Sequence, residues 1–201
     1  MKYKVLRKTK KWYITPNTIF YGGSLICLTP TLICLALGFN ESLWAFIPMY
    51  VALILLFVSM IIGLFKFNKY KTLKGELTSL LEFHHDGIQI DATFYTLDEI
   101  KQIRLENTYD YKGRYVYSRG EFDGSLSNGV ANLLVLNLNN GSSIPIHFQQ
   151  HTEDEILREQ EHFIHYCNAG KLGYLTLLNL LKISDYDQIQ YFKKEYLTKF
   201  Q

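Results

Sequence analysis

Few residues of this sequence have the types and spacing that catalysis or metal binding requires. Glu159 and His162 stand three residues apart, the spacing used by di-iron carboxylate helices, and His162 and His165 share a helix face. A di-metal site needs a second such pair on another helix, which the sequence lacks. We therefore expect these side chains on the solvent face of an amphipathic helix, with no metal site.

Other reactive side chains are also poorly placed for joint chemistry. Asp98 and Glu99 are neighbours in an expected strand, so they point to opposite faces. His84 and His85 precede a turn and are expected to be exposed. The sequence has no P-loop, no dinucleotide-binding glycine motif, no nucleophile elbow and no C-x-x-C pair. We expect no enzyme, no catalytic residue and no cofactor.

The charge of the chain is unevenly distributed along its length. Its 201 residues include 21 basic and 19 acidic side chains, and the net charge of +2 argues against a dedicated nucleic-acid binder. Residues 1–11 and 66–74 hold ten basic side chains and no acidic one. From residue 75 onward 11 basic residues face 18 acidic ones. The two basic clusters flank an apolar region.

Two uncharged stretches, 18–39 and 43–65, form that region. As helices each would reach roughly 30 Å, which is the hydrocarbon thickness of a bilayer. Because only residues 40–42 separate them, they are expected to form an antiparallel transmembrane hairpin. The positive-inside rule places both basic flanks and both termini in the cytoplasm. We expect a multi-pass protein of the bacterial inner membrane.

The basic clusters are expected to lie at the anionic membrane surface. The lysines concerned are Lys8, Lys10, Lys11, Lys66, Lys69, Lys71 and Lys74. Neither span contains an ionisable side chain, which argues against a pump or transporter. Cys27 and Cys34 are expected as small contact residues of the first helix, and a disulfide framework with Cys167 is not expected.

After residue 75 the apolar pattern changes to short alternations typical of strands with one buried face. We expect strands at 77–83, 88–95, 97–106 and in a hairpin over 131–148. Asn140-Gly141 suits a hairpin turn with positive φ at both residues. Thr152 and Glu155 form a capping-box pattern for a helix that ends at Gly170.

The segment FHHDGIQID followed by TFYTLDEIKQIRLE resembles bacterial pleckstrin-homology-like membrane proteins of the YcxB-like type, over about residues 75–168. The resemblance implies a pleckstrin-homology-like β-barrel or sandwich, and it brings no motif of active-site residues. The expected fold class is thus α+β. The expected order is a basic cytoplasmic segment (1–17), the hairpin (18–66), this domain (75–170) and a C-terminal helical extension (171–201).

The extension begins with an apolar run at 172–181, too short to span a membrane, and Ser184 can cap a second helix. Tyr186, Ile189 and Phe192 recur on roughly one face of that helix. We expect the extension to pack on its own domain. The bilayer surface, another subunit or a foreign protein are the alternatives.

Residues 107–130 are longer than a connection between two strands requires. Tyrosine and arginine dominate interface hot spots, so this loop is the expected partner-binding surface, with a turn at Lys112-Gly113. Its candidate residues are Tyr109, Tyr111, Lys112, Arg114, Tyr115, Tyr117 and Arg119. The alternatives are a structural hairpin, or a phosphoinositide-type anion site whose charge Asp110, Glu121 and Asp123 would weaken.

The sequence as a whole favours a membrane-anchored, non-enzymatic binding protein that recognises a protein partner. One concrete form is an immunity protein that neutralises a bacterial toxin. The alternative is a membrane-tethered sensor that binds a nucleotide or lipid and forms a homo-oligomer through its hairpin. A deep basic pocket would favour the sensor, and a filled core with an exposed Tyr/Arg ridge would favour the protein binder.

Overall fold

The computed structural model describes residues 1–9, 11–38, 43–116 and 121–197, with the backbone alone for 43–45, 63, 64 and 67. The chain divides into two compact units. The first, here the sheet unit, comprises Met1–Thr9, Gly75–Arg114 and Asn128–Gln201. The second, here the helix unit, comprises Lys10–Lys74 and Tyr115–Ser127. Each unit is therefore built from segments distant in sequence.

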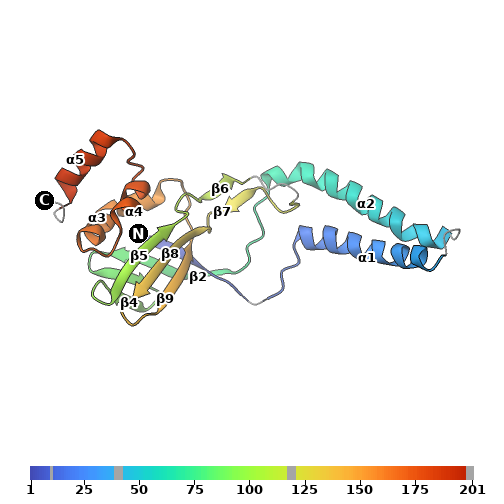
Figure 1. Ribbon diagram of the computed structural model, residues 1–201, viewed down its shortest axis with the longest axis horizontal. Coiled ribbons are helices and arrows are strands. Elements are labelled where there is room, and N and C mark those ends of the chain that lie inside the picture. Colours follow the sequence, from blue (N-terminus) through green and yellow to red (C-terminus); the bar gives the residue numbers. More distant parts are fainter. Residues whose placement is uncertain (10, 39–42, 117–120, 198–201) are drawn as a thin grey trace. The chain divides into compact units, whose positions relative to one another are not determined.

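Two antiparallel helices, α1 (Pro16–Ala36) and α2 (Leu43–Phe65), lie side by side in the helix unit (Figure 1). The hydroxyl oxygen of Thr15 accepts a hydrogen bond from the backbone N–H of Thr18, so it caps α1. By length and composition α1 can cross a membrane. The fully described part of α2 is a shorter apolar helix, Phe46–Ile62.

The sheet unit contains a seven-stranded antiparallel sheet with the order β4-β3-β2-β1-β9-β8-β5 (Figure 1). Its strands are β1 (Lys2–Arg7), β2 (Glu76–His84), β3 (Gly87–Ile90), β4 (Thr93–Thr96), β5 (Ile100–Glu106), β8 (Asn132–Leu138) and β9 (Ser143–Phe148). All except β1 lie within the ranges expected from the alternation, extended by one residue at some ends. The α+β class is confirmed.

Strand β1 is the central strand of the sheet, so the expectation that these residues are only a basic flank is wrong. Tyr3 and Val5 point into the core, where they are 1% and 6% exposed. β1 pairs with β2 on one side and with β9 on the other, and Arg7 at its end lies opposite Glu76. The helix pair is consequently inserted between two neighbouring strands of one sheet.

The β8–β9 hairpin is present, but its turn differs from the expected one. Gly141 has φ +85°, whereas Asn140 has no positive φ. The Asn140 side-chain oxygen instead accepts hydrogen bonds from the backbone N–H and the hydroxyl of Ser142. This geometry fits a longer loop that ends in one left-handed glycine.

Helices cover the core of the sheet unit. They are η2 (Glu155–Glu159), α3 (Gln160–Asn168), α4 (Tyr174–Leu180) and α5 (Tyr186–Tyr196). The α3 residues Phe163 and Tyr166 are fully buried, and the Tyr166 hydroxyl donates to the backbone carbonyls of His84 and Gly87. Three leucines of α4 are buried in the same core, which confirms that the apolar run 172–181 packs on its own domain.

Two expected helix caps are wrong in detail. No capping hydrogen bond from the Thr152 side chain forms at the start of η2, and the Glu155 carboxylate accepts from the backbone N–H of His151 instead. The N-cap of α5 is Asp185 and not Ser184, since Asp185 accepts from two backbone N–H groups of the first turn. Gly170, with φ +74°, follows α3 as expected.

Candidate functional site

A buried polar network fixes the start of the predicted recognition loop. The side chain of Asn132, fully buried on β8, accepts a hydrogen bond from the backbone N–H of Asp110. Its amide group donates to the carbonyls of Asp110, Gly129 and Phe148 at 2.8, 2.9 and 3.2 Å. The carboxylate of Asp110 in turn accepts from the N–H of Ala131. One amide therefore joins three backbone segments.

Gln150, also fully buried, extends this network. Its amide nitrogen donates to the Asn132 side-chain oxygen and to the carbonyl of Thr108. Its side-chain oxygen accepts from the N–H of Ile156, and its backbone carbonyl accepts from the N–H of Lys112. Residues 108–112 are thus fixed from both ends by buried hydrogen bonds, which are costly to break.

Tyr109 of this fixed segment is in contact with Arg114, which follows the segment by two residues. The guanidinium carbon of Arg114 lies 4.5 Å from the centre of the Tyr109 ring, a cation–π contact. Tyr109 is 56% exposed, and its hydroxyl donates to the side chain of Asn107. Among the described residues no carboxylate is recorded within ion-pair distance of Arg114. The pair is a preorganised aromatic and cationic surface.

A pocket of about 340 Å³ lies beside Tyr109. Its lining residues are Leu105, Asn107, Thr108, Tyr109, Glu153, Ile156, Leu157, Thr176, Asn179, Leu180 and Lys182. The only basic residue of this lining is Lys182, whose ammonium group lies 2.9 Å from Asp154 and 3.6 Å from Glu153. These carboxylates also hold the pKa of Lys182 above its usual value. The pocket is therefore not a basic one.

Of the remaining candidate residues, the structure describes Tyr111, Lys112 and Tyr115. A turn is present at Lys112-Gly113, since the N–H of Arg114 donates to the carbonyl of Tyr111 and Gly113 has φ +90°. Both residues nevertheless belong to strand β6 (Lys112–Tyr115), so they are not the tip of a protruding hairpin. β6 pairs with β7 (Leu126–Asn128) in a separate two-stranded ribbon. Tyr111 is half-buried and Lys112 exposed, both in the sheet unit, while the exposed Tyr115 belongs to the helix unit. Tyr117 and Arg119 lie outside the described residues.

Residues 121–126, here the clasp, bind the chain that follows α2. The backbone carbonyl of Glu121 accepts a hydrogen bond from the ammonium group of Lys66 at 2.7 Å. The carboxylate of Glu121 lies 3.1 Å from the ammonium group of Lys71. Asp123 accepts from the backbone N–H and the hydroxyl of Thr72. A Cβ on Gly124 would lie 2.3 Å from the carbonyl oxygen of Lys69, so only glycine allows this approach.

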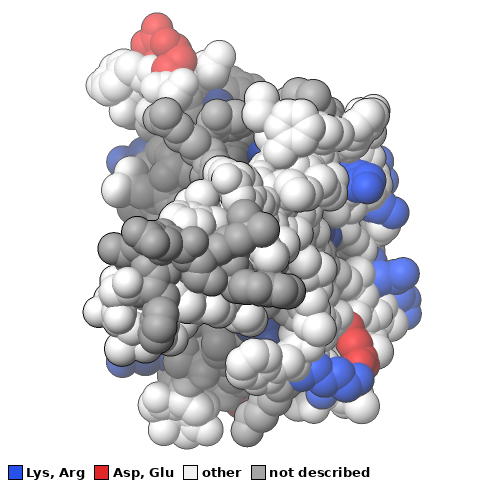
Figure 2. Space-filling view, turned by 90° about the vertical axis from the view of Figure 1, so that its right-hand side faces the viewer, with Lys and Arg blue, Asp and Glu red and all other residues white. Residues whose placement is uncertain are grey.

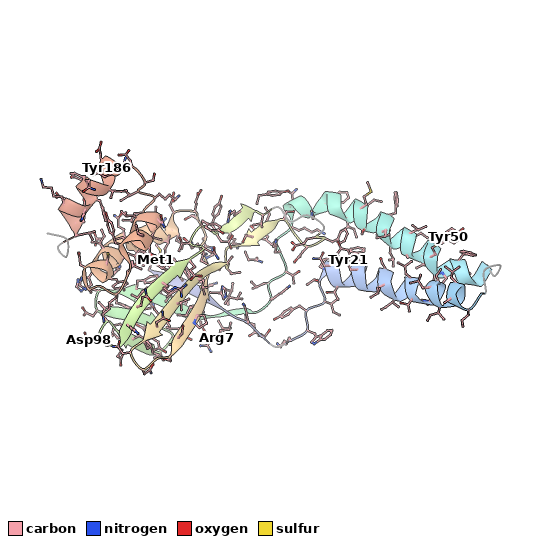
Figure 3. The ribbon with its side chains drawn as sticks, in the orientation of Figure 1. Met1, Arg7, Tyr21, Tyr50, Asp98 and Tyr186 are labelled. Atoms are coloured by element: carbon pink, nitrogen blue, oxygen red, sulfur yellow. The ribbon has the colours of Figure 1, made fainter. Side chains whose placement is uncertain are left out.

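The clasp also binds the first turn of α1. The ring of Phe122 lies 5.2 Å from the ring of Phe20 and 5.4 Å from that of Tyr21, which is labelled in Figure 3. The backbone N–H of Phe122 donates to the side chain of Asn17. The clasp therefore ties together the two helix ends that lie next to the basic clusters. The clasp was not expected from the sequence, although the acidic residues Glu121 and Asp123 next to two lysine-rich segments were a signal for it.

The lysines predicted at a membrane surface differ in their surroundings. Lys66 and Lys71 are half-buried and bonded to Glu121. Exposed lysines are Lys8, Lys11, Lys69 and Lys74, and Lys10 lies outside the described residues. Neither α1 nor α2 contains a charged residue. In the view of Figure 2, Lys and Arg atoms (blue) are visible mainly along the right-hand edge.

Glu159 is 2% exposed, so the expectation of a solvent-facing Glu159 is wrong. Its carboxylate oxygens lie 3.0 Å from Nδ1 of His162 and 3.1 Å from the nitrogen of Met1. The pKa of Tyr3 is raised far above its usual value. Burial is the larger cause, and the negative charge of Glu159 is the second. No group of three His, Cys, Asp or Glu side chains within the described ranges could hold a metal.

His165 gives the sheet unit a pH dependence. The centre of its ring lies 3.6 Å from that of His85, with 30° between the ring planes. Burial, followed by the charge of His85, lowers the pKa of His165 below the usual 6.5. Below pH 6.5 the unfolded chain then binds more protons than the folded one, so stability falls as the pH falls toward the folded pKa.

We expect the thermal midpoint to drop between pH 7.5 and pH 5.5, and to drop less in His165→Phe, which keeps an aromatic ring at this position without a titrating group. Part of the drop should remain, because burial also lowers the pKa of His147. Thermal melts at the two pH values measure the difference. An equal drop in the variant would show that His165 does not carry this dependence.

Comparison with known proteins adds no relative: no family model matches the chain, and no curated protein or solved structure matches it.

Proposed function

We propose that the chain is a membrane-anchored, non-enzymatic binding protein of the bacterial inner membrane that recognises a protein partner through Tyr109 and Arg114. An immunity protein that neutralises a toxin is one form of this function. The proposed fold of the sheet unit is pleckstrin-homology-like, supported by two antiparallel meanders that share strand β1 and by the covering helix α3.

The insertion of the helix pair between β1 and β2 supports the anchor. Because Arg7 lies opposite Glu76, the chain leaves and re-enters one sheet at neighbouring positions. A helix pair that crosses a bilayer from there must return to the side from which it started. The outer faces of α1 and α2 are apolar and exposed, for example Ile26 at 73% and Met60 at 69%, which suits lipid better than water.

The filled core and the exposed Tyr109–Arg114 pair support recognition of a protein over a nucleotide sensor. The large side chains of Tyr3, Phe148 and Phe163 are fully buried and fill the core of the sheet unit. The pocket beside Tyr109 balances Lys182 against two carboxylates and so lacks an excess of positive charge. An exposed tyrosine stacked on an arginine is the usual composition of an interface hot spot.

We expect Arg114→Ala and Tyr109→Ala each to weaken partner binding by about 2 kcal/mol, roughly thirtyfold. Both side chains are partly exposed, so stability should change little. The partner is first captured with the tagged full-length protein in detergent. Affinities and thermal midpoints of the variants are then compared.

Arg104→Ala is the matched control, because Arg104 is an exposed arginine of β5 that pairs with Glu106. It should bind the partner normally. Loss of stability with normal binding in the Tyr109 and Arg114 variants would make this segment structural and would remove the proposed recognition role.

A further inference from the structure

We propose that the lysines following α2 bind the phosphate of an anionic phospholipid, and that Glu121 of the clasp competes with this phosphate. The inference deepens the proposed membrane anchoring and rests on it. It concerns Lys66, Lys69 and Lys71, which all lie within six residues after Phe65, the last residue of α2. Ammonium groups at this place on a membrane helix reach the headgroup layer.

The clasp holds the backbone of these lysines in a fixed arrangement. The carbonyls of Lys66 and Lys69 accept hydrogen bonds from the N–H groups of Ser125 and Leu126, at 3.1 and 3.0 Å. The N–H of Lys71 donates to the carbonyl of Leu126 at 2.8 Å. A fixed backbone lowers the entropy cost of gathering several cations around one anion.

The charges of the clasp leave this cluster positive. Asp123 is already occupied, since it accepts from the backbone and hydroxyl of Thr72 and from the N–H of Gly124. Glu121 offers one carboxylate, which pairs with Lys71, while Lys66 contacts only the neutral carbonyl of Glu121 in the recorded contacts. The three lysines thus face two carboxylates, Glu121 and Asp123, and keep an excess of one positive charge, which a phosphate can neutralise.

Glu121 and a lipid phosphate would bind the ammonium group of Lys71 with similar strength. The side chains of Lys71 and Glu121 are 29% and 43% exposed, and ion pairs with this exposure are weak. The attraction of one lysine to an anionic leaflet is of similar size. The backbone hydrogen bonds and the Phe122 packing are independent of this pair, so the clasp stays bound when the partner of Lys71 changes.

The test uses the full-length protein in nanodiscs of phosphatidylcholine containing 30% phosphatidylglycerol. Native mass spectrometry then measures the ratio of the two lipids that remain bound. We expect enrichment of phosphatidylglycerol, a loss of at least about threefold in that enrichment for Lys66→Gln with Lys69→Gln, and a gain for Glu121→Gln. Lys101→Gln, an exposed lysine on β5, is the control and should change nothing.

Unchanged enrichment in the lysine variant, or reduced enrichment in Glu121→Gln, would overturn the inference. Displacement of the bound phosphatidylglycerol by millimolar inorganic phosphate would also contradict it, because the site would then read free phosphate. Carbonate extraction of each variant separates this inference from the proposed function. A protein that stays in the membrane without lipid preference loses only the lipid site, whereas an extracted protein loses the anchor.

Discussion

A fragment that starts at Gly75 is expected not to fold, although it contains every strand that follows the helix pair. It lacks β1, which alone joins β2 to β9. Without it the sheet separates into two three-stranded pieces, and the core loses the buried side chains of Tyr3 and Val5. This loss is comparable with the whole stability of a domain, about 5 to 15 kcal/mol.

The matched variant keeps β1 and removes the helices. A short Gly-Ser linker from Arg7 to Glu76 replaces residues 8–75, because these two residues are already neighbours in the β1–β2 pairing. We expect this variant to be folded, with cooperative thermal unfolding by circular dichroism, and the Gly75 fragment to show none. Cooperative unfolding of the Gly75 fragment would contradict the central place of β1.

Asn132→Leu is expected to lower the free energy of unfolding by about 3 kcal/mol or more. The leucine cannot replace the hydrogen bonds that the Asn132 side chain makes to the N–H of Asp110, to the carbonyls of Gly129 and Phe148 and to the amide of Gln150, so the buried network loses its central member. Each unsatisfied buried group costs about 1 to 3 kcal/mol. Chemical denaturation of the full-length protein in detergent, followed by near-UV circular dichroism, measures the change.

Asn137→Leu is the control on the same strand. Asn137 is half-buried, and its recorded side-chain contact is one long hydrogen bond of 3.5 Å to Gln102. We expect this variant within about 0.5 kcal/mol of the parent protein. Equal effects of the two substitutions would mean that strand propensity, and not the buried network, explains the loss at Asn132.

The strands after residue 75 were predictable because one of their faces is buried and their sequence alternates. The same pattern is present in β1, where the buried Tyr3 and Val5 alternate with the exposed Lys2 and Lys4. Its charge suggested a membrane flank, and its partners β2 and β9 lie more than 60 residues away. Local pattern cannot reveal such a distant pairing, so the strand was missed.

The candidate site was predicted in part. Tyr109 and Arg114 were named from their residue types, and the structure does bring them into contact. Composition could not show that the same loop continues into the clasp, since this depends on Asn17 and Lys66, which lie far away in sequence. The burial of Glu159 was missed for a similar reason, because it faces Tyr3 of the unrecognised strand.

Cysteine accessibility tests the central claim, that a hairpin anchors the sheet unit with both flanks on the cytoplasmic side. In a cysteine-free background, Ser42→Cys marks the connection between the helices, which lies outside the described residues, and Ser142→Cys marks an exposed turn of the sheet unit. An impermeant maleimide applied to intact spheroplasts should label position 42, and should label position 142 only after permeabilisation. Labelling at position 142 in intact spheroplasts would contradict the account.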